Sequence, residues 1–68
     1  MENLTSMGLV TYHSNLNRKD RVKLKNYVAS MLELSYSVID ARFTGRAQFT
    51  KAELIALKNV ISQELWKG

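Results

Sequence analysis

The sequence predicts an all-α fold: a small domain of three helices preceded by a loosely ordered N-terminal arm. Apolar residues recur at three- and four-residue spacing in residues 24–32 and 54–65, and this spacing places them on one face of a helix. Residues that commonly cap helices, Asn17, Ser35 and Thr50, precede each predicted helix. The chain has 68 residues, no Cys and no Pro. A single core, with no disulfide or thiolate metal site, must therefore stabilise it.

The N-terminal segment lacks helical periodicity. Gly8 disfavours a helix there, and the apolar residues between Met7 and Tyr12 are compatible with a short strand. We therefore expect residues 1–16 to form a flexible arm or short strand and residues 17–67 to form the helical domain.

The first predicted helix spans residues 18–33. Asn17 can cap it, and the charge of Asp20 suits the first turn. Its apolar positions predict one buried face, made of Leu24, Tyr27, Val28, Met31 and Leu32. The first half is basic, with a local net charge of +4 over residues 18–25.

The second predicted helix spans residues 36–44 and begins after Ser35. Gly45 can adopt the left-handed conformation that ends a helix. We expect three apolar side chains to face inward, those of Val38, Ile39 and Phe43. Asp40 and Ala41 are expected to point outward.

The third predicted helix spans residues 51–66. Thr50 and Glu53 have the spacing of a capping box. The apolar stripe consists of Leu54, Leu57, Val60, Ile61 and Leu65. Trp66 either caps the core or, together with Leu65, anchors a dimer interface, where aromatic residues are enriched.

The junction of the first two helices carries a motif. The string Val28-Ala29-x-x-Leu32-x-Leu34-Ser35 resembles the signature of the phage repressor/Cro-like helix-turn-helix DNA-binding family, in its short bacterial and mobile-element variant. Thr44-Gly45-Arg46 is similar to the typical ending of that family's recognition helix. Glu33 stands where the family usually has glycine, a replacement tolerated where the backbone need not be left-handed. The family's separate first helix is not evident in residues 1–16.

The resemblance implies a sequence-specific DNA-binding protein that regulates transcription of a bacterial, phage or mobile-element operon. The 36–44 helix would enter the major groove. Its base-contacting residues would be Ser35, Tyr36, Ser37, Asp40 and Ala41. The phosphate-contacting residues would be Lys23, Lys25, Arg42, Arg46 and Lys51. Both sets could equally be solvated helix faces.

Composition and charge bear on the class of partner. The net charge of +4 favours a polyanion, and we expect double-stranded DNA, bound by a protein that could form a homodimer. His13 is the only histidine and has no metal ligands at suitable spacing, so we expect no metal site. We also expect no enzymatic activity, no cofactor, no small-molecule substrate, no membrane association and a cytoplasmic location.

The main alternative is a small basic helical protein-interaction module, such as a phage-encoded inhibitor of a host protein. An exposed ridge of Tyr36, Ser37 and Ala41, flanked by Lys and Arg, would favour DNA. Burial of these side chains would exclude the motif. A membrane-surface helix is disfavoured, because the core needs the apolar face of residues 18–33.

Overall fold

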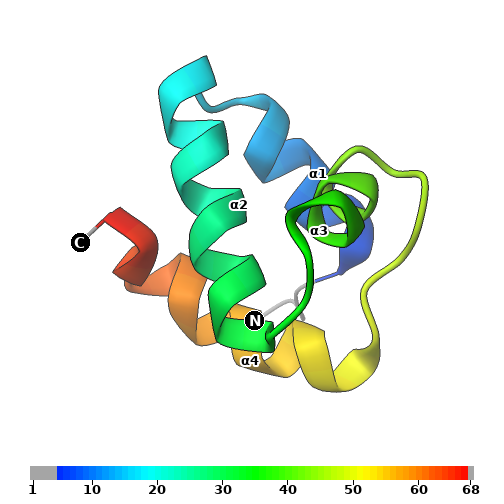
Figure 1. The fold of residues 1–68 in the computed structure, drawn as a ribbon. Coiled ribbons are helices and arrows are strands. Elements are labelled where there is room, and N and C mark those ends of the chain that lie inside the picture. Colours follow the sequence, from blue (N-terminus) through cyan, green and yellow to red (C-terminus); the bar gives the residue numbers. More distant parts are fainter. Residues whose placement is uncertain (1–4, 68) are drawn as a thin grey trace.

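The computed structural model describes residues 5–67, and within this range the chain is helical with no strand. The elements are α1 (Ser6–Ser14), α2 (Arg18–Leu32), α3 (Tyr36–Phe43), α4 (Lys51–Ser62) and a short 3-10 helix, η1 (Leu65–Lys67) (Figure 1). The predicted all-α fold is confirmed, with one helix more than the sequence indicated.

The additional helix, α1, lies in the segment predicted to be an arm or strand, so that prediction is wrong for residues 6–14. Thr5 caps α1 by accepting a hydrogen bond from the backbone N–H of Gly8 at 3.0 Å. Leu9 and His13, one turn apart, are both buried. Ser6 Oγ accepts a hydrogen bond from the backbone N–H of Phe49 at 2.7 Å, which fastens α1 to the α3–α4 connection. Residues 1–4 of the predicted arm lie outside the described residues.

Helix α2 begins as predicted, because Asn17 Oδ1 accepts from the backbone N–H of Asp20 at 2.8 Å. It ends one residue earlier than predicted, at Leu32. Most of the expected face is buried or half-buried, but Met31 is exposed, so its prediction as a core residue is wrong. The small side chain of Ala29 is buried on this face.

Helix α3 is capped by Ser35, whose hydroxyl accepts from the backbone N–H of Val38 at 3.3 Å. Gly45 has the expected positive φ of 88°. Ile39 and Phe43 are buried as predicted, whereas Val38 is 38% exposed. Its inward orientation was wrongly predicted, because only the i, i+4 pair on α3 faces the core.

Helix α4 begins with the predicted capping box, formed by Thr50 and Glu53. It ends at Ser62 rather than at residue 66. The backbone then turns through Glu64, whose φ is 52°. This turn lets η1 return along α2 and places Trp66 in the core.

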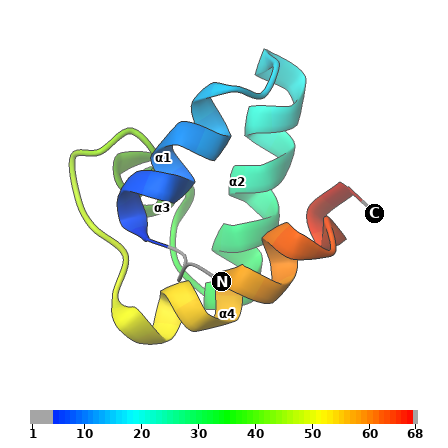
Figure 2. The same cartoon turned by 180° about the vertical axis from the view of Figure 1, so that it is seen from behind.

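Opposite views show how the helices surround the core. In Figure 1, α3 is seen nearly end-on in front of α1, and α4 passes near the C-terminal end of α2. In Figure 2, α1 is in front. Helix α3 packs against both α1 and α2. The buried apolar side chains are Leu9, Leu24, Val28, Ala29, Ile39, Phe43, Phe49, Leu57, Val60 and Trp66.

Candidate nucleic-acid interface

The connection between α2 and α3 is three residues long and has a defined geometry. The backbone N–H of Leu34 donates to Ala29 O at 3.0 Å, and that of Glu33 donates to Ser30 O at 3.3 Å. This pair of bonds is the Schellman motif, which requires a left-handed residue after the helix. Glu33 is that residue, with φ 58° and ψ 40°. The condition under which glutamate replaces glycine without strain, a backbone that is not left-handed, is therefore not met at Glu33.

The beginning of α3 presents polar and aromatic side chains to solvent. Ser35 and Ser37 are exposed, and Tyr36 is 38% exposed. Ala41, one turn after Ser37, is half-buried. Of the three residues expected to separate the two functional classes, Tyr36 and Ser37 are therefore exposed and Ala41 is half-buried, and none of them is fully buried.

Asp40, in the middle of α3, pairs with two cations from other parts of the chain. Its Oδ1 accepts from Lys25 Nζ on α2 at 2.8 Å, and its Oδ2 accepts from Arg46 Nη2 at 3.1 Å. The Lys25 hydrogen bond, reinforced by the positive charges of both partners, holds the pKa of Asp40 below its usual value. Burial lowers the pKa of Lys25, but the hydrogen bond to Asp40 and the neighbouring Tyr36 side chain outweigh it and leave the pKa raised. At neutral pH the Asp40 carboxylate and the Lys25 ammonium are therefore both charged.

Two of the predicted phosphate contacts are engaged inside the protein. The Lys25 side chain is only 11% exposed and lies 5.2 Å from the centre of the Tyr36 ring. Arg42 pairs with Glu53 of α4, and its guanidinium lies 5.9 Å from the Phe49 ring. Lys25 and Arg42 are therefore each paired with a carboxylate of the protein itself, and their contacts with phosphate stay predictions.

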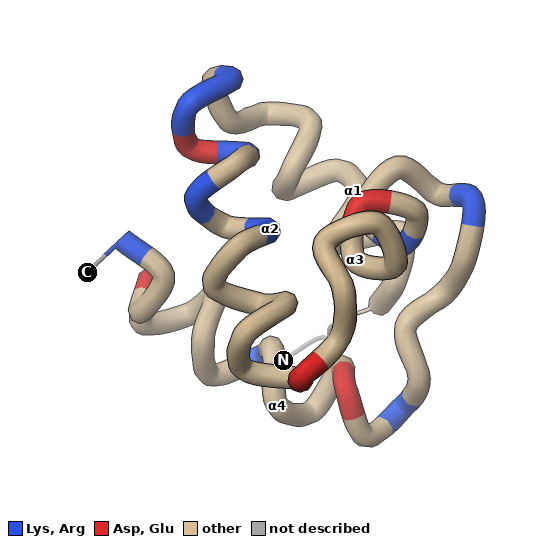
Figure 3. Tube along the Cα trace, viewed as in Figure 1, with Lys and Arg blue, Asp and Glu red and all other residues tan. Residues whose placement is uncertain are grey.

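The other three predicted phosphate contacts, Lys23, Arg46 and Lys51, are exposed. Lys51 opens α4, and Arg46 follows α3. Lys23 instead donates to Lys67 O at 2.9 Å, so its amino group lies against η1. Figure 3 shows basic residues on two sides of α3, along the first half of α2 and in the segment after α3.

The two predicted dimer residues behave differently. Trp66 is 2% exposed, and its indole N–H donates to Tyr12 Oη at 3.2 Å. Of the two roles considered for it, capping the core is the one observed, and anchoring a dimer is wrong. Leu65 remains on the surface, at 40% exposed.

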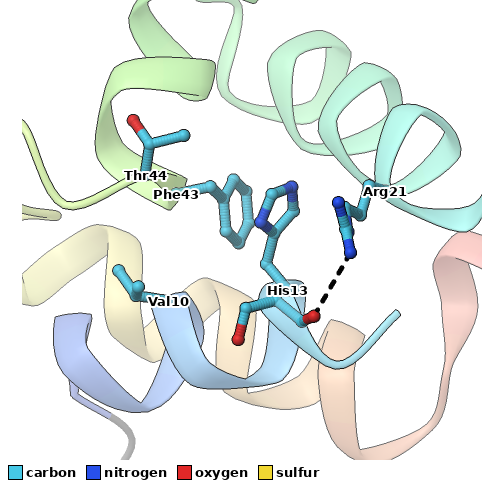
Figure 4. A pocket seen from close by; sticks show the side chains of 6 residues that line it. Val10, His13, Arg21, Phe43 and Thr44 are labelled. Carbon is cyan, nitrogen blue, oxygen red and sulfur yellow. Dashed lines mark hydrogen bonds between the residues drawn. The ribbon is translucent and has the colours of Figure 1, made fainter. Parts of the chain in front are cut away.

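A cleft of about 300 Å³ lies where α1, α2 and α3 meet (Figure 4). It is lined by Val10, His13, Ser14, Arg21, Phe43 and Thr44. The His13 ring stacks on Phe43 at 5.1 Å between centres. Its Nε2 is buried and has no hydrogen-bond partner among residues 5–67. Burial, followed by the charges of Lys25 and Arg21, lowers the pKa of His13 and favours the neutral ring.

Other kinds of site find little support in the described part of the chain. No three His, Cys, Asp or Glu side chains of residues 5–67 gather as a metal ion would require. Nor does this range contain a helix with the length and apolar character needed to cross a bilayer.

Comparison with protein-family models, with curated proteins and with solved structures found no match. Function must therefore be inferred from the fold, the exposed face of α3 and the arrangement of charges. Sequence reasoning did not identify the partners of the cations. Glu53 was recognised only as a helix cap, and Thr44 only as part of the string that ends α3, although Thr44 Oγ1 accepts from Arg46 Nε at 3.2 Å.

Proposed function

We propose that the protein is a sequence-specific DNA-binding protein that inserts α3 into the major groove and regulates a bacterial, phage or mobile-element operon. The observation that carries this proposal is the α2–turn–α3 unit. Its short turn is left-handed at Glu33, the position where the resembling family has glycine. A turn of this kind fits the helix-turn-helix interpretation of the sequence. The proposed regulation of transcription comes from the resemblance to that family.

The additional helix also supports the proposal. The sequence resemblance lacked the separate first helix of the family, and α1 occupies that place in the chain order. It packs against α3 on the side occupied by the buried Leu9 and His13. The N-terminal side chains of α3 therefore remain accessible, as a helix that reads a groove requires.

Individual roles within the interface follow from exposure. Ser35, Tyr36 and Ser37 are the proposed base contacts at the start of α3, since hydroxyl groups can both donate to and accept from base edges. Asp40 is already bound to Lys25 and Arg46, so its proposed role is to position those groups. Lys51 is the clearest proposed phosphate contact, because it is exposed and has no ion-pair partner in residues 5–67.

The test is binding to random and genomic DNA fragments at two salt concentrations, followed by sequencing of the bound pool. We expect an enriched motif, and two-fold symmetry in that motif would indicate a dimer. Lys51→Ala should reduce the salt dependence of log K by about 0.9 for one lost phosphate contact. Lys58→Ala is the matched control, since it removes an equal charge from an exposed position on α4. Absence of binding at low salt would refute the proposed function.

One observation favours the alternative of a protein-interaction module. Tyr36 and Val38 are each 38% exposed near the start of α3, and an exposed aromatic and aliphatic pair suits a protein partner. Under this alternative, DNA selection enriches no motif and binding lacks the steep salt dependence of phosphate contacts.

A further inference from the structure

The guanidinium of Arg46 is fixed along one edge. Its Nε donates to Thr44 Oγ1 at 3.2 Å, and its Nη2 donates to Asp40 Oδ2 at 3.1 Å. An arginine side chain carries five N–H donors in a rigid planar fork. The two bonds use the edge formed by Nε and Nη2. They leave the outer edge, where Nη1 and the second Nη2 proton lie, directed away from these partners.

That outer edge is accessible. The Arg46 side chain is 67% exposed although it is bound at two points. Most exposed arginine side chains lose conformational freedom when they bind, which weakens the contact. Arg46 has part of this freedom removed before any ligand arrives, so its outer edge is a preorganised pair of donors.

The charges around Arg46 favour a neutral acceptor over an anion. Asp40 remains ionised, because its hydrogen bond to Lys25 and the nearby cations lower its pKa. A phosphate approaching Arg46 would therefore meet a carboxylate bonded directly to the same guanidinium. An uncharged acceptor would not experience this repulsion and would still receive two directed hydrogen bonds.

We propose that Arg46 reads a guanine in the major groove, with its outer edge donating to O6 and N7 and with Thr44 and Asp40 as positioning residues. These two guanine acceptors match a bidentate arginine fork. Asp40 lies one turn after Tyr36 on α3, so the bond to Asp40 holds the fork beside the helix that enters the groove. This inference rests on the proposed function, and it replaces the sequence-based expectation that Arg46 contacts a phosphate.

The experiment compares the wild type with Arg46→Lys and Arg46→Ala by selection from random DNA at two salt concentrations. We expect the wild type to require guanine at one position in each site. Arg46→Lys keeps the charge but not the planar fork, and it should reduce discrimination at that position only in part, because a lysine can also donate to O6 and N7 of guanine. Arg46→Ala removes every donor, so it should reduce discrimination by about 5- to 150-fold while leaving the salt dependence of log K nearly unchanged.

A second measurement examines the acceptor itself. A duplex with 7-deazaguanine at the selected position lacks N7, so it should weaken binding of the wild type and have little effect on Arg46→Ala, which has no donor. Thr44→Val removes the acceptor of Nε but keeps the charge of Arg46. It should reduce the guanine preference in the same direction, with an unchanged salt dependence.

The outcomes separate this inference from the proposed function. If Arg46→Ala retains the guanine preference and lowers the salt dependence of log K by about 0.9, Arg46 contacts a phosphate. That result overturns the inference and leaves the proposed function standing. If the wild type binds no DNA at low salt, both are refuted. Circular dichroism of each variant establishes that the fold is retained.

Discussion

Replacing Glu33 by glycine should stabilise the protein. Glu33 has a left-handed backbone with φ 58°, a conformation that costs a residue with a β-carbon about 1–2 kcal/mol. Glycine adopts it without that cost but has more freedom in the unfolded chain, which offsets about 0.4–1 kcal/mol. The Glu33 side chain is exposed and makes no ion pair within residues 5–67. At the midpoints of these two ranges the net gain is about 0.8 kcal/mol.

The assay is urea and thermal unfolding followed by circular dichroism. A gain of this size in a domain this small should raise Tm by about 2–8 °C. Glu33→Ala is the matched control, because it removes the charge and keeps the β-carbon, and it should change stability little. Ala56→Gly, at an exposed position within α4, should instead cost about 1 kcal/mol. If Glu33→Gly is no more stable than Glu33→Ala, the role of the left-handed turn is refuted.

Three further predictions concern the core and its charges. Asp40→Asn should lower the free energy of unfolding at pH 7 by about 1–3 kcal/mol, because it weakens the ion pair with Lys25. Because folding lowers the pKa of Asp40, the wild type should be more stable than Asp40→Asn above the unfolded-state pKa, and this difference should diminish as the pH falls through the folded-state pKa. A stability difference that does not change with pH would contradict this explanation. Trp66→Ala should lower the free energy of unfolding by about 3–5 kcal/mol, and Trp66→Phe should lower it clearly less. Urea titrations measure both changes, and a small loss of stability in Trp66→Ala would place the indole outside the core. Because folding lowers the pKa of His13, the wild type should lose stability as the pH falls from above the unfolded-state pKa of this residue through its folded-state pKa. His13→Phe should lack this loss. If the two proteins have the same dependence of stability on pH, His13 is not its source.

The starts of α2, α3 and α4 could be predicted because their signals are local. Asn17, Ser35 and Thr50 each bind a backbone N–H three residues ahead, so the sequence itself contains both partners. The end of α4 was harder to predict. Apolar spacing continues to Trp66, but the backbone leaves the helical conformation at Gln63 (φ −102°, ψ 1°) and at Glu64 (φ 52°), and neither residue has glycine's preference for a positive φ.

Helix α1 was missed because its buried face is small and mixed. Leu9 and His13 are its only buried residues. Because histidine is counted as a polar residue, the buried face of α1 shows no apolar periodicity. Gly8 further weakens the intrinsic helix propensity. Tertiary packing against α3 compensates for this weakness, and packing of that kind cannot be deduced from local spacing.

The charged partners at the candidate interface were also beyond sequence reasoning. Lys25 and Asp40 are 15 residues apart on different helices, and no local pattern pairs them. The net charge of the chain is known from the sequence, but the sequence does not tell which basic side chains are free to contact a ligand. Exposure of α3 could be anticipated from the motif, whereas the internal neutralisation of Lys25 and Arg42 needed the three-dimensional arrangement.

The hydrogen bond between Trp66 and Tyr12 has a consequence for how the molecule assembles. Its partners are 54 residues apart in the sequence. A second long-range hydrogen bond joins Phe49 and Ser6, which are 43 residues apart. Contacts between such distant parts of a chain close late, because a large loop must lose its freedom first. During synthesis, the indole of Trp66 emerges after all the other buried apolar residues of the core. A nascent chain should therefore reach its native packing only once residue 66 has left the ribosome, in a single late step.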